Sequence, residues 1–179
     1  LCCLSAGEVM RLTRLGRFDM SAEARGIMGL LKRLRGSRGG GSSSGQGQMR
    51  MLRELPRLLR FIPGTAQDVR AYFLALQYWL AGTPENIANM VRMLVGRYAA
   101  GPRASLSGRV SAAPPIQYPD VGLYHPAAPG RIFDDAAWLP KRGTAGTVGV
   151  LIMRSYVLAD NAAHYDGVIA ALEGRGLRV

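Results

Sequence analysis

Apolar side chains recur at helical spacing in the middle of the chain and predict two helices joined by a tight turn. Thr65 and Asp68 match a capping box at the start of the first helix, and Gly82 is suited to end it. Thr83 and Pro84 suit the cap and first turn of the second helix. The apolar faces comprise Val69, Tyr72, Phe73, Leu76, Trp79 and Leu80 in the first helix, and Ile87, Val91, Leu94, Val95 and Tyr98 in the second. We expect these faces to pack together, because an aromatic stripe at this spacing is more often core than a cofactor-binding surface.

The pattern before this helix pair predicts the end of an α/β unit. Residues 1–4 indicate a buried strand, residues 5–8 a turn, and the apolar positions over 9–15 a helix. A second helix is expected over 22–34, and its basic end suits the helix dipole better than a membrane surface. The Gly- and Ser-rich residues 36–48 predict a flexible loop without a phosphate-binding signature. Residues 49–61 predict a further helical stretch, interrupted at Pro56.

The last third of the chain passes from an irregular stretch to alternating elements. Prolines punctuate residues 101–142, and residues 147–153 form a continuous apolar run typical of a strand buried on both faces. Residues 154–159 are expected to be a loop, followed by a helix capped by Asp160 or Asn161 and a strand from Leu177. The apolar face of that helix comprises Tyr165, Val168, Ile169 and Leu172. Strand, loop, helix and strand in this order predict a parallel sheet.

Together these elements predict an α/β fold in three segments. Residues 1–100 are interpreted as the end of an α/β amino-terminal region, with the loop 36–48 and helices over about 50–98 that include the helical hairpin. Residues 101–142 are the proline-rich irregular connection, and residues 143–179 are the start of a parallel α/β core. Leu1 is not an initiator Met and the last strand is cut short, so we expect an interior fragment of a longer protein.

Composition and charge exclude some classes of protein and leave others open. The 179 residues are 48% apolar, enough for a sizeable core, and no apolar run approaches the roughly 18 residues of a membrane-spanning helix. Cys2 and Cys3 are adjacent and cannot form a disulfide framework. The net charge of +11 is concentrated in residues 1–60, which hold 12 basic and 4 acidic side chains. A solvated basic face is favoured, and a nucleic-acid or membrane-surface module is kept as an alternative.

The loop after the predicted strand offers the best candidate binding site, since ligands of parallel sheets bind beyond the carboxyl ends of the strands. Arg154 can hold a carboxylate there, with Ser155, Tyr156 and the amino terminus of the next helix beside it. His164 follows in that helix and is a candidate catalytic residue. The alternatives, an ion pair between Arg154 and Asp160 and a partly buried His164, stay open.

Other polar residues give weaker signals. His125 lies in a Tyr-His-Pro turn, where it can donate a proton or bind a metal. No further His or Cys stands at the spacing of a closed zinc site, so no metal site is predicted. No nucleophile elbow surrounds Ser155, which disfavours a serine–histidine–aspartate triad. The adjacent acids Asp134 and Asp135 are expected to be solvated.

Four groups of short motifs follow one another along the chain. They are Ser5-Ala-Gly-Glu8 with Leu12-Thr-Arg-Leu-Gly16; Ala75-Leu-Gln-Tyr-Trp-Leu-Ala-Gly-Thr-Pro-Glu-Asn-Ile-Ala-Asn89 with Gly96-Arg-Tyr98; Tyr118-Pro-Asp-Val-Gly122 with Tyr124-His-Pro126; and Gly146-Thr-Val-Gly149 with Arg154-Ser-Tyr156 and His164-Tyr-Asp-Gly167. In this order they resemble the family of the large porphyrin-binding subunit, the H subunit, of magnesium chelatases. The related cobaltochelatase large subunit shares an Arg-Ser element, but the Leu76-Gln-Tyr-Trp-Leu80 segment and His164-Tyr165 argue against it.

The resemblance implies a part in (bacterio)chlorophyll biosynthesis, in which the family binds protoporphyrin IX while Mg²⁺ is inserted. It implies ATP hydrolysis by partner subunits, an AAA+ ATPase and its companion, and a fragment that is inactive alone. It also implies a cytoplasmic location in a photosynthetic bacterium, with peripheral association with the photosynthetic membrane as a further option. No established catalytic residue of the family maps onto this chain, so His125, His164 and Arg154 are candidates from the motifs only.

Overall fold

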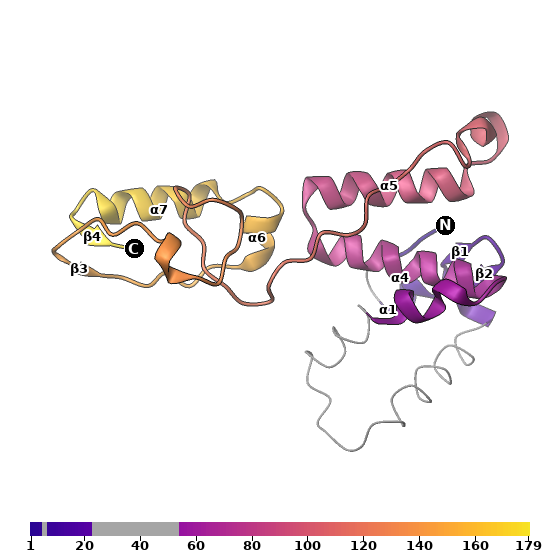
Figure 1. Ribbon diagram of the computed structural model, residues 1–179, viewed down its shortest axis with the longest axis horizontal. Coiled ribbons are helices and arrows are strands. Elements are labelled where there is room, and N and C mark those ends of the chain that lie inside the picture. Colours follow the sequence, from indigo (N-terminus) through magenta and orange to yellow (C-terminus); the bar gives the residue numbers. More distant parts are fainter. Residues whose placement is uncertain (5–6, 23–53) are drawn as a thin grey trace, which may run out of the picture. The chain divides into compact units, whose positions relative to one another are not determined.

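The computed structural model describes residues 1–4, 7–22 and 54–179 of the chain (Figure 1). The loop expected over 36–48, and the helix expected over 22–34 apart from its first residue, lie outside these residues. Contacts divide the chain into a first unit, Leu1–Leu80 with Ala88–Pro115, and a second unit, Ala81–Ile87 with Ile116–Val179. The described residues form a mixture of helices and very short strands, which is compatible with an α/β class, but none of their strands has the length expected of it.

The first unit begins with a hairpin where the sequence pattern predicted a longer helix. Helix α1 (Gly7–Met10) is a single turn, and strands β1 (Arg14–Leu15) and β2 (Phe18–Asp19) follow as an antiparallel pair. Gly16 lies in the turn between the strands at φ +56°, a conformation that a right-handed helix does not contain. The helix predicted over 9–15 is therefore wrong beyond Met10.

The first four residues are extended but do not form the predicted buried strand. The backbone groups of Leu1 exchange hydrogen bonds with those of Arg14 at 2.8 and 2.9 Å, and Cys3 N–H donates to Thr13 Oγ1 at 3.0 Å. Leu1 is exposed and Cys2 is only half-buried. The segment thus runs along the edge of the hairpin but bonds to it only at Leu1 and Cys3, which is too little pairing to make a strand.

The core of the first unit joins the hairpin to the helices. Its buried members are Leu15, Phe18, Leu55, Leu59, Val69, Tyr72 and Phe73, of which the last three come from α4 (Thr65–Ala81). Three aromatic rings pack in series, with centroids 5.9 Å apart between Phe18 and Tyr72 and 5.6 Å apart between Tyr72 and Phe73. The aromatic stripe of α4 is core at this end, as predicted. At the other end of the helix Trp79 is exposed and Tyr78 is buried in its place.

The tight connection between the two long helices follows the prediction. Helix α4 ends at Ala81, Gly82 adopts φ +66°, and α5 (Pro84–Tyr98) begins two residues later. Thr83 Oγ1 accepts a hydrogen bond from the backbone N–H of Asn86 at 3.2 Å, which is the expected cap. In the first unit, Leu94 and Tyr98 of α5 pack against the core.

The capping box predicted at Thr65 and Asp68 does not form, because Thr65 is already the first residue of α4. The Asp68 carboxylate instead accepts hydrogen bonds from Arg17 N at 3.0 Å and from the Tyr98 hydroxyl at 2.7 Å. Burial, and then the bond to Asp68, raise the pKa of Tyr98. Asp68 therefore connects the hairpin, α4 and α5 within the first unit.

The proline-rich stretch is irregular, as predicted. Its regular elements are the 3-10 helices η2 (Gly101–Leu106) and η3 (Ala136–Trp138) and a single antiparallel bridge between Leu123 and Phe133. Asp135 caps η3 by accepting from Ala137 N at 2.8 Å, a role that sequence alone did not suggest for this acid.

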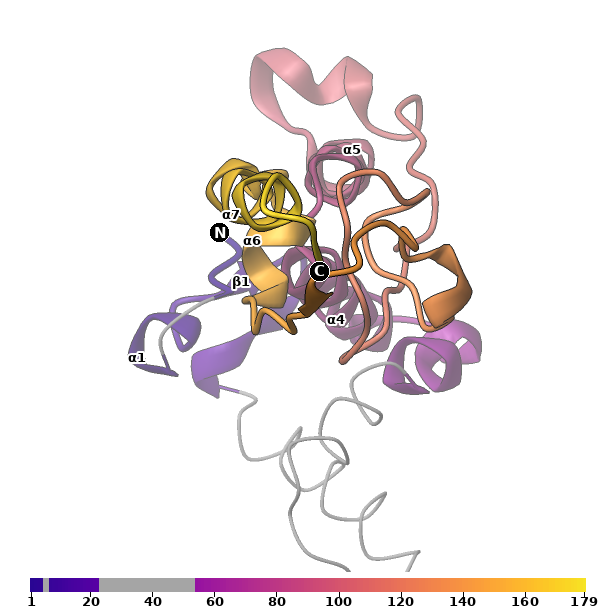
Figure 2. The ribbon, with the colours of Figure 1, turned by 90° about the vertical axis from the view of Figure 1, so that its left-hand side faces the viewer.

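The second unit ends in a small parallel α/β element. Strand β3 (Gly146–Thr147) pairs in parallel with β4 (Leu177–Arg178), and α6 (Arg154–Leu158) and α7 (Ala163–Glu173) lie between them in the chain. Figures 1 and 2 show α7 beside the strand pair. The order of elements and the parallel pairing agree with the prediction, and the loop expected over 154–159 is a short helix.

Two further predictions in this region are wrong. The strand expected over 147–153 ends at Thr147, and Leu151 is fully exposed. A strand buried on both faces needs a neighbouring strand on each side and packed layers above and below the sheet. Within the described residues, β3 has only one neighbouring strand, β4. Neither Asp160 nor Asn161 caps α7, since its N-cap is Ala162 and has no side-chain cap.

Candidate functional site

All five residues singled out from the sequence lie in the second unit, but they do not converge on one point. Arg154, Ser155 and Tyr156 form the first turn of α6, and His164 lies in the first turn of α7. His125 lies in the irregular stretch, in the loop between the bridged residues Leu123 and Phe133. The structure brings Tyr156 and His164 together and places His125 and Arg154 in separate surroundings.

The Arg154 guanidinium holds the backbone of the preceding irregular stretch. Its Nε donates to Pro119 O at 2.7 Å and its Nη2 to Tyr118 O at 3.2 Å. Asp160, the alternative partner considered from the sequence, lies 3.1 Å from Arg131 instead. Two of the donors of Arg154 are thus used internally, which restricts the directions from which it can meet a carboxylate ligand.

Tyr156 and His164 form an exposed aromatic cluster with Tyr165. The ring centroids are 5.1 Å apart between Tyr156 and His164, with the rings nearly perpendicular, and 3.9 Å apart between His164 and Tyr165. The Tyr165 hydroxyl accepts from Met153 N at 3.2 Å. His164 is exposed, so the interpretation as a partly buried histidine is wrong, and its ring is open to a ligand or to water.

His125 is buried and its tautomer is fixed by a local turn. Its Nδ1 accepts a hydrogen bond from Ala127 N at 3.1 Å, so the neutral ring carries its proton on Nε2. Nε2 lies 3.3 Å from Glu173 Oε1 but without the geometry of a hydrogen bond. The hydrogen bond from Ala127 N occupies the lone pair of Nδ1, so Nδ1 is not open to a ligand while this turn is kept.

An apolar cavity of about 470 Å³ lies between the irregular stretch, the run after β3, and α6 and α7. Its walls come from residues 120–124 and 147–152, together with Val157 and Ile169. Arg154 and Arg178 are the basic residues that line it. The volume lies within the roughly 300–1,000 Å³ typical of pockets for small organic ligands.

A second cavity, of about 490 Å³, is polar. It is lined by Tyr124, His125, Arg131, Asp160 and Asp166 among others. The Tyr124 hydroxyl donates to Asp166 Oδ1 at 2.5 Å, and burial followed by this bond raises the pKa of Tyr124 to about 12. Within residues 1–4, 7–22 and 54–179, no three His, Cys, Asp or Glu side chains are grouped as a metal site.

Sequence reasoning missed Tyr124, Asp166, Arg131 and Arg178 as members of these cavities. Tyr124 and Asp166 belong to motifs that were recognised, but their contact spans 42 residues and no local pattern reports it. Arg131 pairs with Asp160 and lies 3.7 Å from Glu85, again over long separations. None of the described helices is long and apolar enough to cross a membrane.

Comparison with known proteins gives the following matches. Residues 1–73 match the model of a domain of unknown function (DUF3479), and residues 76–179 match that of CobN/Magnesium Chelatase. Over 96% of its length the chain is 51% identical to the magnesium-chelatase H subunit of Rhodobacter capsulatus, and equally to that of Cereibacter sphaeroides. It is 32% identical over 98% of its length to the chloroplastic magnesium-chelatase ChlH subunit of Oryza sativa subsp. indica. The chain spans only 13–14% of the length of these relatives. No solved structure matches it.

Proposed function

We propose a function on one premise: the chain belongs to the CobN/Magnesium Chelatase family. It forms part of a magnesium chelatase H subunit, which binds protoporphyrin IX and inserts Mg²⁺ in (bacterio)chlorophyll biosynthesis. ATP is hydrolysed by the two partner subunits, an AAA+ ATPase and its companion. The relatives reported above are magnesium and not cobalt enzymes, which favours this function over cobalt insertion.

The proposal rests on the apolar cavity of the second unit, whose lining includes two arginines, Arg154 and Arg178. A porphyrin is a flat apolar ring with two propionates, so it needs apolar walls and cationic groups at its edge. Residues 121–123 and 147–152 supply such walls, and Arg178 and Arg154 supply positive charge beside one acid, Asp120. Leu151, fully exposed here, gains an apolar neighbour when a ring lies in the cavity.

Insertion of Mg²⁺ releases the two pyrrole N–H protons of the ring, so the site needs a proton acceptor. Neither His164 nor His125 lines the apolar cavity. Of the two, His164 suits this role better, because its ring is exposed and can be approached by a ring held at the cavity, while Nδ1 of His125 is occupied by the turn. Tyr156, packed edge-on against His164, orients the imidazole. Ser155 is exposed on the same turn as Tyr156 and can donate a hydrogen bond to a propionate.

The test is quenching of protoporphyrin IX fluorescence by the purified chain. We expect saturable quenching, and about tenfold weaker binding for Ile152→Asp, because a buried carboxylate opposes an apolar ligand. Val168→Asp is the matched control, since Val168 is a half-exposed apolar residue outside both cavities. The same pair of substitutions is then placed in the full-length protein and assayed for Mg²⁺ insertion with the partner subunits and ATP. Equal effects of the two substitutions on binding would refute the cavity as the porphyrin site.

A further inference from the structure

The two cavities of the second unit share part of their walls. Tyr124 and Val157 line both the apolar cavity of about 470 Å³ and the polar cavity of about 490 Å³. Val157 is buried and its side chain is a hydrocarbon. Of these two shared residues, Tyr124 is therefore the one whose side chain can pass a proton from one cavity to the other.

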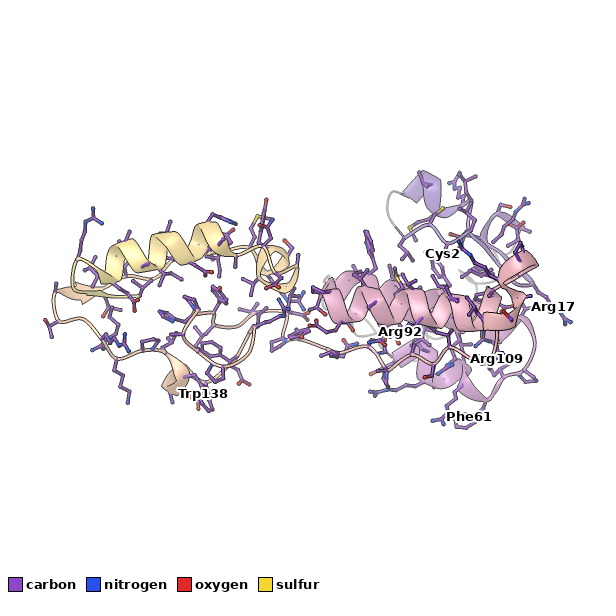
Figure 3. All side chains as sticks on the ribbon, turned by 90° about the horizontal axis from the view of Figure 1, so that it is seen from above. Cys2, Arg17, Phe61, Arg92, Arg109 and Trp138 are labelled. Carbon is purple, nitrogen blue, oxygen red and sulfur yellow. The ribbon has the colours of Figure 1, made fainter. Side chains whose placement is uncertain are left out.

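The Tyr124 hydroxyl is directed by a carboxylate of the polar cavity. It donates a hydrogen bond to Asp166 Oδ1 at 2.5 Å, and Asp166 lines the polar cavity but not the apolar one. This distance is typical of a hydroxyl bonded to a carboxylate. The bond joins the irregular stretch to the first turn of α7, and Figure 3 shows Trp138 of the same stretch on its outer side, away from α7. The apolar cavity, Tyr124, Asp166 and the polar cavity thus lie in series.

The hydroxyl and the carboxylate are suited to different parts of a proton transfer. Burial, and then the bond to Asp166, raise the pKa of Tyr124 to about 12, so the hydroxyl keeps its proton at neutral pH. A neutral hydroxyl can accept a proton on its oxygen lone pair while it gives its own proton to a neighbouring acceptor. The Asp166 carboxylate is that acceptor, since the Tyr124 hydroxyl is already bonded to it.

The polar cavity connects Asp166 to solvent. Asp160 Oδ1 and Arg131 Nη1 lie 3.1 Å apart at this cavity, and Asp160 is exposed. A polar cavity of this size has room for several water molecules, because one water occupies roughly 30 Å³ in the liquid. A proton that reaches Asp166 can therefore leave through water, whereas the mainly aliphatic walls of the apolar cavity offer few groups to hold such water.

We propose that Tyr124 and Asp166 form a proton relay that carries a pyrrole proton from the apolar cavity to the polar one. The relay rests on the proposed function, which assigns protoporphyrin IX to the apolar cavity. When Mg²⁺ enters the ring, two pyrrole N–H bonds break, and the electron pairs that stay on the nitrogens bind the metal. A bound cation favours this loss of protons.

Two protons leave the ring, and one imidazole can hold only one of them. His164 accepts the first proton, as proposed above. For the second, Tyr124 Oη accepts the proton from the ring nitrogen and releases its own to Asp166 Oδ1, so Tyr124 is neutral before and after the step. Asp166 then gives this proton to water in the polar cavity and is a carboxylate again. No electron is gained or lost by any group.

The test is Mg²⁺ insertion into protoporphyrin IX by the full-length protein with its partner subunits and ATP, measured in H₂O and in D₂O. Tyr124→Phe removes only the hydroxyl, and Asp166→Asn keeps an oxygen that accepts the hydrogen bond but cannot take up the proton. We expect each variant to lower kcat about tenfold or more and to increase the solvent isotope effect on kcat, because proton exit then limits the rate. Protoporphyrin IX binding, measured by fluorescence quenching, should stay within about twofold of the parent value, since no apolar wall is changed. Asp166→Glu keeps a carboxylate and should recover part of the lost kcat.

The matched control is Tyr98→Phe in the first unit. The Tyr98 hydroxyl donates the same kind of bond to Asp68 at 2.7 Å, and Tyr98 lines neither cavity. Its loss should leave kcat and the isotope effect unchanged, and circular dichroism checks the fold of every variant.

The relay is overturned if Tyr124→Phe and Tyr98→Phe lower kcat equally, or if kcat falls in Tyr124→Phe while the isotope effect stays that of the parent, since the bond is then only structural. It is also overturned if kcat is unchanged in both Tyr124→Phe and Asp166→Asn. These outcomes leave the proposed function standing. Equal effects of Ile152→Asp and Val168→Asp on protoporphyrin binding overturn the cavity as the porphyrin site, and the relay with it.

Discussion

Asn86 is the side chain whose removal tests the packing of the second unit most directly. It is fully buried in the first turn of α5. Its Oδ1 accepts from Ile116 N at 2.9 Å and its Nδ2 donates to Ile116 O at 3.0 Å, so one amide replaces the backbone pairing that a neighbouring strand would provide. Asn86→Ala removes both bonds and leaves the backbone groups of Ile116 without these partners.

The free-energy cost of Asn86→Ala depends on how exposed to water the backbone groups of Ile116 are. An unsatisfied buried polar group costs about 1–3 kcal/mol, and the lower part of that range applies because Ile116 is partly exposed. Two such groups give about 2–3 kcal/mol, which corresponds to a roughly 30- to 140-fold rise in the opening equilibrium at Ile116. The cap bond from Asn86 N to Thr83 Oγ1 is kept in the variant, so α5 itself should remain.

The assay is amide hydrogen exchange of Ile116, with urea unfolding as a second measurement. Asn86→Asp separates the two bonds, because a carboxylate keeps the acceptor for Ile116 N–H and loses the donor to Ile116 O. Asn89→Ala is the matched control on the same helix, since the bond that Asn89 Oδ1 accepts from Ala113 N at 3.1 Å is exposed to solvent and its loss is expected to cost under about 1 kcal/mol. Unchanged exchange at Ile116 in Asn86→Ala would show that the paired bonds contribute nothing, and the reasoning would be refuted.

Two further predictions concern the polar cavity. His125→Asn should keep the slow exchange of the Ala127 amide, because an Asn side-chain oxygen can accept the same hydrogen bond from the backbone two residues later. His125→Leu should lose that protection from exchange. Equal exchange in the two variants would contradict the tautomer assigned to His125. The pKa of Tyr124 is raised from 10.0 to about 12 in the folded protein. Between these two values the folded protein holds a proton that the unfolded chain has lost. The stability that Tyr124 contributes is therefore fully present below pH 10 and falls as the pH rises towards 12. Urea unfolding across this range should therefore show a shallower loss of stability in Tyr124→Phe than in the parent chain, and identical slopes would indicate that the Tyr124–Asp166 bond does not shift the titration.

The candidate site was only partly visible in the sequence. The motifs pointed to the unit that contains both cavities, and to Tyr156 and His164, which do lie together. They also suggested Arg154 as a carboxylate clamp, although its guanidinium is used by the carbonyls of Tyr118 and Pro119. A motif shows which residue types are present. It does not show which group binds a charged side chain, and for Arg154 that group is the carbonyl of Pro119, 35 residues away.

Local chemistry by itself determined the helix pair, its joint and the order of the last elements. Gly82, Thr83 and Pro84 act within one or two residues of where they stand, through a positive φ, a cap and a fixed first turn, so no distant contact is needed to foresee them. The helix before β4 also followed from local periodicity, and the parallel pairing of β3 with β4 followed from the general rule for a strand–helix–strand order.

Only the tertiary structure decided the hairpin at the start, the length of β3 and the membership of the two cavities. An apolar residue at position 15 serves a helix face or a hairpin equally well, and Gly16 against the Asp68 carboxylate selects the hairpin. The run after Thr147 has the composition of a buried strand, but the strands and layers that bury such a run are not encoded in the run itself. Burial and pairing are properties of what comes to lie alongside a segment, and the charge and periodicity of the segment leave that choice open.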